Sequence, residues 1–126
     1  YTMAQDKECC CGGVKMIFPC SGSADVGGLA DQAARKLTRD GIGKMSCLAG
    51  VGGGVSGIIK SAEAAEKILV IDGCPLECAK KTMEKAGFAS FNHIRLAELG
   101  FEKGKSPVTD ENIAKIVLIG AEMLKA

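Results

Sequence analysis

Hydrophobic residues fall into short runs that alternate with longer segments of helical periodicity. The clearest run spans Lys67 to Asp72, and its continuously apolar centre is typical of a parallel strand covered on both faces. Similar runs predict further strands at residues 14–18, 44–48 and 88–96. Apolar residues at helical spacing predict helices over residues 24–39, part of 57–66, 75–86 and 110–124.

Capping residues indicate where the predicted helices begin. Ser23 is the expected N-cap of the first helix, and Thr109 or Asp110 is that of the last. Pro75 suits the first position of a helix, which makes Cys74 the expected N-cap there. Strands that alternate with helices predict a parallel sheet with helices on both faces. The predicted fold is therefore a three-layer α/β/α sandwich with a mostly parallel four-stranded sheet, flavodoxin-like or Rossmann-like.

The chain divides into a tail and one domain. Residues 1–13 lack helix or strand periodicity and contain Cys9, Cys10 and Cys11, which predicts a flexible, cysteine-rich tail. These cysteines could be extra ligands, a resolving thiol, or thiols without a role. Residues 14–126 are predicted to form a single α/β domain, because the chain of 126 residues is long enough for one core.

Composition and charge exclude several classes of partner. The formal net charge is +1 and aromatic residues make up only 4%, which argues against a nucleic-acid surface. No apolar run approaches the roughly 20 residues of a membrane span, and the first 13 residues have no apolar signal-peptide core. We therefore expect a cytoplasmic protein that binds neither nucleic acid nor membrane. In that compartment seven cysteines favour metal binding or redox chemistry over disulfides.

Four cysteines lie where strands end, and we refer to them as the four core cysteines. Cys20 follows the first predicted strand, Cys47 lies near the end of the second, Cys74 follows the third, and Cys78 comes four residues later. The carboxyl ends of parallel strands share one edge of the sheet, where ligands bind in open α/β folds. If the three strands are neighbours, their ends lie within roughly 10 Å of one another.

The predicted helix start adds a reason to expect thiolates here. With Cys74 as N-cap and Cys78 one turn later, both sulfurs would share a helix face, and the free amides of the first turn would stabilise negative charge. Four thiolates complete a tetrahedral zinc shell. The same set could hold an iron–sulfur cluster, although its spacing matches no common ferredoxin motif. Two alternatives remain, namely redox or sulfur-transfer chemistry at a single cysteine of lowered pKa, and inert cysteines in the core.

Other motifs give weaker indications. The glycine-rich run over residues 49–57 contains G-x-G-x-x-G but follows the second strand, so we expect a flexible loop without a helix interior, or alternatively an anion-binding nest.

His93 is the only histidine and is expected to be structural or on the surface. Asp72 is a candidate acceptor for amides at the start of the next helix. No catalytic residue is predicted, and hydrolase activity is not indicated.

Three motifs resemble the DGC domain family, which is named after a central Asp-Gly-Cys. They are Pro19-Cys20-Ser21-Gly22, Met45-Ser46-Cys47-Leu48-Ala49-Gly50 and Ile71-Asp72-Gly73-Cys74-Pro75-Leu76-Glu77-Cys78-Ala79-Lys80-Lys81. The resemblance extends from about Val14 to the final helix. It implies a zinc-binding protein whose four chelating residues are the four core cysteines, and it names no reaction. We therefore expect a single-domain zinc-binding protein, with a thiol-based redox or sulfur-transfer enzyme as the alternative. A third hypothesis is a partner-binding accessory domain that uses the glycine-rich run and the cysteine tail as its contact surface.

Overall fold

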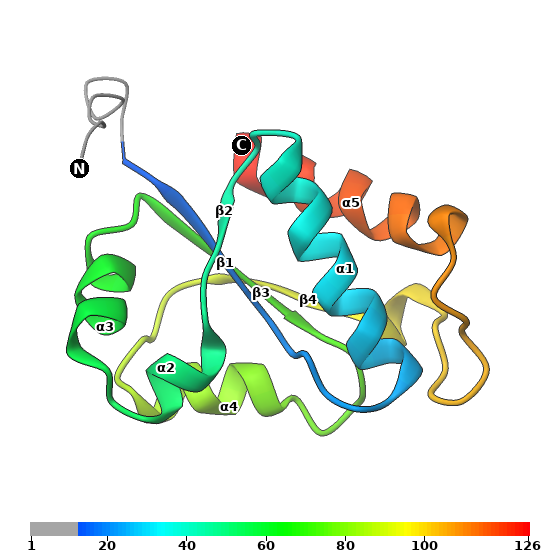
Figure 1. The fold of residues 1–126 in the computed structure, drawn as a ribbon, viewed down its shortest axis with the longest axis horizontal. Helices are drawn as coiled ribbons and strands as arrows, with labels where there is room; N and C mark the ends of the chain where they lie inside the picture. The colour runs from blue at the N-terminus through cyan, green and yellow to red at the C-terminus, as the bar shows by residue number, and fades with distance from the viewer. Residues whose placement is uncertain (1–12) are drawn as a thin grey trace.

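The protein is described by a computed structural model over residues 13–126 (Figure 1). The predicted tail with Cys9, Cys10 and Cys11 lies outside the described residues. The strands are β1 (Lys15–Pro19), β2 (Lys44–Met45), β3 (Lys67–Asp72) and β4 (Asn92–Arg95). The helices are α1 (Asp25–Arg39), α2 (Leu48–Gly52), α3 (Ser56–Glu63), α4 (Cys78–Lys85) and α5 (Asp110–Lys125).

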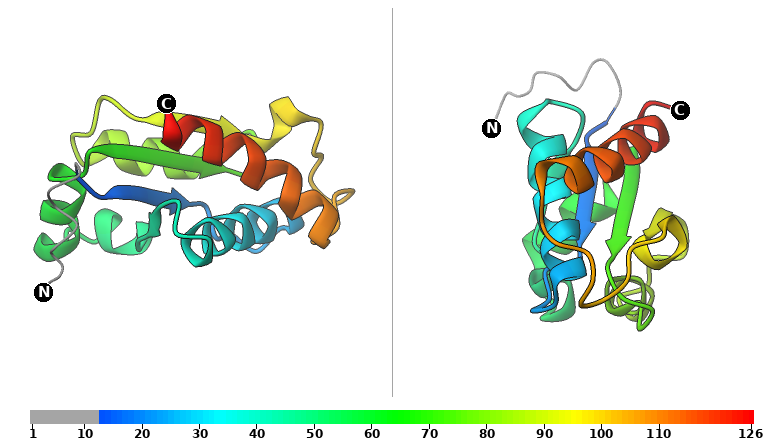
Figure 2. Two further views of the ribbon diagram at one scale, coloured as in Figure 1. Left: turned by 90° about the horizontal axis from the view of Figure 1, so that it is seen from above. Right: turned by 90° about the vertical axis from the view of Figure 1, so that its right-hand side faces the viewer.

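The sheet is parallel throughout, and its strand order is β2-β1-β3-β4. β1 and β3 run side by side in both views of Figure 2 and pair from Lys15 opposite Lys67 to Pro19 opposite Ile71. The chain passes from β1 outward to β2, then returns past β1 to β3 on its other side. The strand order therefore reverses at β1 and β3, and ligands in such sheets bind beyond the carboxyl ends of the strands at this point.

Helices cover both faces of the sheet, which confirms the predicted three-layer α/β fold. Ile17 and Leu69 belong to the core beneath α1 and α5, whereas Phe18 and Val70 belong to the core beneath α2, α3 and α4. Figure 1 shows α1 beside α5, with the other three helices grouped across the strands. Alternate strand residues thus serve opposite faces, which explains why the central strands are apolar at nearly every position.

Two strands are shorter than the sequence predicted. Ser46 still donates to the Ile17 carbonyl at 2.9 Å, but the chain then turns into α2, so β2 does not reach residue 48. β4 begins at Asn92 and not at Phe88, because the Phe88 amide donates to the Met83 carbonyl and completes the end of α4.

The glycine-rich run forms helix where the sequence predicted a loop. It contains most of α2 and the start of α3. A side chain at Gly50 would collide with Ile58, so glycine at this position allows the two short helices to pack closely. The predicted loop is therefore wrong, because glycine here provides space for close helix packing and not only backbone freedom.

None of the helices in the described part of the chain combines the length and hydropathy that a membrane span requires.

Candidate functional site

Three of the four core cysteines follow neighbouring strands. β1 lies between β2 and β3, and Cys20 comes directly after it, with its amide donating to the Ile71 carbonyl at 2.8 Å. Cys47 lies two residues beyond β2 and is the N-cap of α2. Cys74 lies two residues beyond β3. The three strands are therefore neighbours, and their carboxyl ends share one part of the sheet edge.

The four core cysteines have different environments. Cys20 is half-buried against the core beneath α2, α3 and α4, whereas Cys74 is half-buried against the core beneath α1 and α5. Cys47 and Cys78 are exposed, and all four are free thiols. Within residues 13–126, no three His, Cys, Asp or Glu side chains are close enough together to hold one metal ion. The structure thus places the four thiols at the ends of elements along one edge without gathering them around a single point.

Helix α4 begins at Cys78, so the predicted start at Pro75 is wrong. Its N-cap is Glu77, whose φ of 57° lies in the left-handed region; among the described residues it is the only non-glycine with a positive φ. Cys74 is therefore not an N-cap, and it does not share a helix face with Cys78.

Asp72 caps α4 from the end of β3. Its side chain is only 1% exposed, Oδ1 accepts from the Ala79 amide at 2.8 Å, and Oδ2 accepts from the Lys80 amide at 3.0 Å. The expectation that Asp72 would accept from the start of the next helix is confirmed. The carboxylate satisfies amides that have no partner within the helix and lies at the positive end of the helix dipole. The amides expected to stabilise thiolates are therefore bound to a carboxylate.

His93 completes the contacts of Asp72, a role that the sequence did not reveal. Asp72 Oδ2 lies 2.8 Å from His93 Nε2, and the Phe91 ring packs edge-on against the imidazole with 6.3 Å between ring centroids. His93 is on β4, opposite Val70 of β3. The sequence shows a histidine on one predicted strand and an aspartate at the end of another. Their pairing could be predicted only with the knowledge that β4 lies next to β3.

The segment between Cys74 and Cys78 is tied to β4 by an ion pair. Arg95 Nη1 donates to Glu77 Oε2 at 2.7 Å, and this hydrogen bond holds the pKa of Glu77 below its usual range. Arg95 also pairs with Glu98. The ion pair therefore holds Glu77 in place, the residue in the left-handed conformation directly before α4.

Gly73 allows the end of β3 to touch the first turn of α1. A Cβ atom on Gly73 would lie 2.7 Å from the backbone carbon and oxygen of Val26 and 2.9 Å from the Gly27 amide nitrogen. The Asp-Gly-Cys residues thus have separate local positions: Asp72 caps a helix, Gly73 permits close backbone packing, and Cys74 lies at the edge.

Asp25 ties the loop before α5 to the start of α1. The predicted N-cap Ser23 is not used; Ala24 is the N-cap and makes no side-chain capping bond. Instead Asp25 Oδ1 accepts from the Gly104 amide at 2.9 Å, and Oδ2 accepts from the Ser106 amide at 3.0 Å. These backbone hydrogen bonds hold the pKa of Asp25 below its usual range.

The lowered pKa of Asp25 predicts a contribution to stability that depends on pH. Ionised Asp25 stabilises the folded state above the unfolded-state pKa of about 3.9, and this stability is lost as the pH falls through the lower folded-state pKa. We expect Asp25→Asn to be less stable than wild type at neutral pH, with the difference shrinking below about pH 4. Urea unfolding followed by circular dichroism, at neutral pH and below pH 4, measures the difference in the free energy of unfolding and its change with pH. Glu63→Gln, at an exposed carboxylate, is the control; a difference for Asp25→Asn that stays constant on acidification would contradict the assignment.

Comparisons with known proteins agree with the sequence motifs. Residues 16–118, which include all four core cysteines, match a family model described as the DGC domain. A relative from Pseudomonas aeruginosa, named "Anaerobic and virulence modulator AnvM", is 38% identical over 88 residues, which cover 70% of this chain and 67% of the relative. No solved structure matches the chain.

Proposed function

Because the chain belongs to the DGC domain family, we propose that it binds a metal ion, specifically zinc, through the four core cysteines. The observation that carries the proposal is their position: three follow neighbouring parallel strands at the carboxyl edge, and the fourth is the first residue of the next helix. Four free thiols are a donor set that suits tetrahedral zinc. An iron–sulfur cluster on the same thiols is the alternative, and colour in the purified protein would indicate it.

Binding of one ion to all four thiols requires a local rearrangement. The exposed Cys47 and Cys78 have to approach the half-buried Cys20 and Cys74, which themselves pack against cores on opposite faces of the sheet. Cys47 is in the turn between β2 and α2, and residues 73–77 join β3 to α4, so these two short segments are where we expect the movement. Coupling of this kind between metal binding and local structure is usual for cysteine-rich sites. The ion would then cross-link three strand ends and one helix start.

The relative's name describes a modulator. We extend only that coarse description, and propose that this chain is a metal-dependent modulator. The alternative is a redox or sulfur-transfer enzyme with one nucleophilic cysteine. The contacts of Asp72 weigh against Cys78 in that role, because the carboxylate occupies the Ala79 and Lys80 amides that would otherwise favour a thiolate.

Alkylation of each cysteine separates the two functions. The full chain, purified without oxygen, is treated with iodoacetamide with and without a chelator, and each modified cysteine is quantified by mass spectrometry. If zinc is bound, all four core cysteines react slowly until chelator is added. The nucleophile hypothesis instead predicts one cysteine that reacts fast at neutral pH whether or not chelator is present. Rates that are fast and independent of chelator at all four positions would contradict metal binding.

A further inference from the structure

A cavity of about 950 Å³ opens at the carboxyl edge of the sheet, on the side of β2. Its walls come from α1, from the turn that leads from β2 into α2, and from Thr82 on α4. Of the four core cysteines only Cys47 lines it. The cavity is large enough for a small organic molecule, and ligands of open α/β folds bind at this edge.

The charged wall of the cavity belongs to α1. Asp31 accepts from Arg35 Nε at 2.7 Å and from Ser21 Oγ at 2.8 Å. Burial raises the pKa of Asp31, but the hydrogen bonds from Arg35 and Ser21 outweigh it and hold the pKa below the usual value, so the carboxylate is ionised and balances Arg35. Arg39, one turn further along α1, also lines the cavity and makes no ion pair with any residue in the range 13–126. Among the described residues that line the cavity, Arg39 is therefore the cation without an ion pair.

The part of the lining that does not come from α1 is mostly apolar. Pro19, Met45, Leu48 and Ala49 belong to it, and they come from the end of β1, from β2 and from α2. An apolar surface with a few polar groups that fix orientation is the usual composition of a small-molecule site. An arginine in the same lining as such a surface suits a ligand with an anionic group and a hydrocarbon body, because guanidinium binds carboxylate and phosphate oxygens through paired hydrogen bonds.

We propose that this cavity binds a small amphipathic organic anion, whose carboxylate or phosphate contacts Arg39 and whose hydrocarbon part lies against Met45 and Leu48. The proposal goes beyond metal binding and does not depend on it, because the groups that recognise the ligand are not cysteines. It places an organic ligand next to Cys47, so that an occupied cavity covers one of the four core cysteines.

Cys47 provides a reporter within the cavity, and Cys78 an exposed thiol outside it. The full chain is alkylated with iodoacetamide in the presence of chelator, so that bound metal cannot protect either thiol, and in the presence of octanoate, octyl phosphate or neutral octanol. We expect both anions, or one of them, to slow alkylation at Cys47 and not at Cys78, and octanol to have no comparable effect. Protection by one anion alone would identify which anionic group the cavity prefers.

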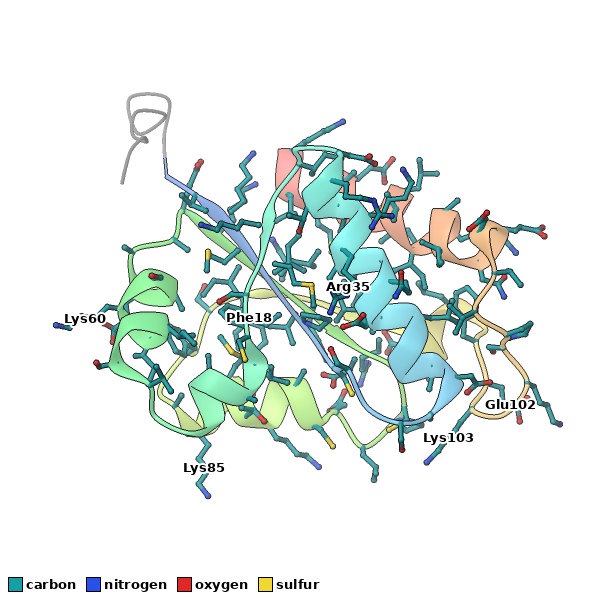
Figure 3. The ribbon with its side chains drawn as sticks, in the orientation of Figure 1. Phe18, Arg35, Lys60, Lys85, Glu102 and Lys103 are labelled. Carbon is teal, nitrogen blue, oxygen red and sulfur yellow. The ribbon has the colours of Figure 1, made fainter. Side chains whose placement is uncertain are left out.

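Surface variants test the recognition without disturbing the core. Arg39→Ala is expected to require about fivefold more anion for the same protection, the upper range for an exposed ion pair. Ala49→Glu, which adds a carboxylate to the mostly apolar part of the lining, is expected to abolish protection. Lys60→Ala is the control, since Lys60 points outward from α3 whereas Arg35 marks the α1 wall in Figure 3. The proposal is overturned if neither anion protects Cys47, if octanol protects it equally, or if Arg39→Ala behaves like Lys60→Ala. Circular dichroism of each variant verifies folding.

Discussion

Replacement of Asp72 by alanine is expected to lower the free energy of unfolding by about 3 kcal/mol. The side chain is 1% exposed and accepts from two amides of α4 while it also contacts His93. Its removal leaves the buried Ala79 amide and the partly buried Lys80 amide without this partner, and each unsatisfied buried donor costs about 1–3 kcal/mol. It also takes the negative charge from the start of α4, where the helix dipole favours it.

Denaturant unfolding of Asp72→Ala, Asp72→Asn and Asp110→Ala tests this expectation. Asparagine keeps one acceptor oxygen and should lose less stability than alanine. Asp110 is an exposed acidic residue in the first turn of α5, so its replacement serves as the matched control. Equal losses in Asp72→Ala and Asp110→Ala would show that the contacts of Asp72 do not hold the end of β3 to α4.

Gly73→Ala is expected to cost about 2–3 kcal/mol, because the new Cβ atom has no space. It would lie 2.7 Å from the backbone of Val26, and a backbone atom cannot rotate away as the end of a side chain can. Gly57→Ala is the matched control, since its Cβ would meet no atom within 4 Å and its φ is not positive. Alanine also favours a helix more than glycine does, so Gly57→Ala should be neutral or slightly stabilising. Thermal unfolding of both variants measures the difference; similar melting temperatures would contradict the close contact of β3 with α1.

The sequence predicted the α/β fold because its strongest signals were a continuous apolar run and two long segments of helical periodicity. The continuous apolar run of β3 and the helical spacing in α1 and α5 each required one type of element. Thr109 was a correct cap, since its side chain accepts from the Asn112 amide, as expected of a threonine in that place. The placement of Cys20 and Cys74 just after strands was also correct, because it depends only on where apolar runs stop.

The details of the site could not be predicted in the same way, because they depend on contacts between distant residues. Pro75 favoured an early helix start, but Asp72 binds amides seven and eight residues further along and the helix begins at Cys78. The pairing of His93 with Asp72 required the strand order. Local patterns give the elements, whereas the contacts that link strand ends to helices arise only when the sheet is assembled.

The central claim is that the four core cysteines bind one metal ion, and metal content tests it most directly. Elemental analysis of the full chain, purified without oxygen, should give about one zinc ion per chain. The zinc should be lost in Cys20→Ser, Cys47→Ser, Cys74→Ser and Cys78→Ser, and retained in Ser23→Ala, a control at an exposed residue of the same edge. A metal content that is unchanged in all four cysteine variants would contradict the account.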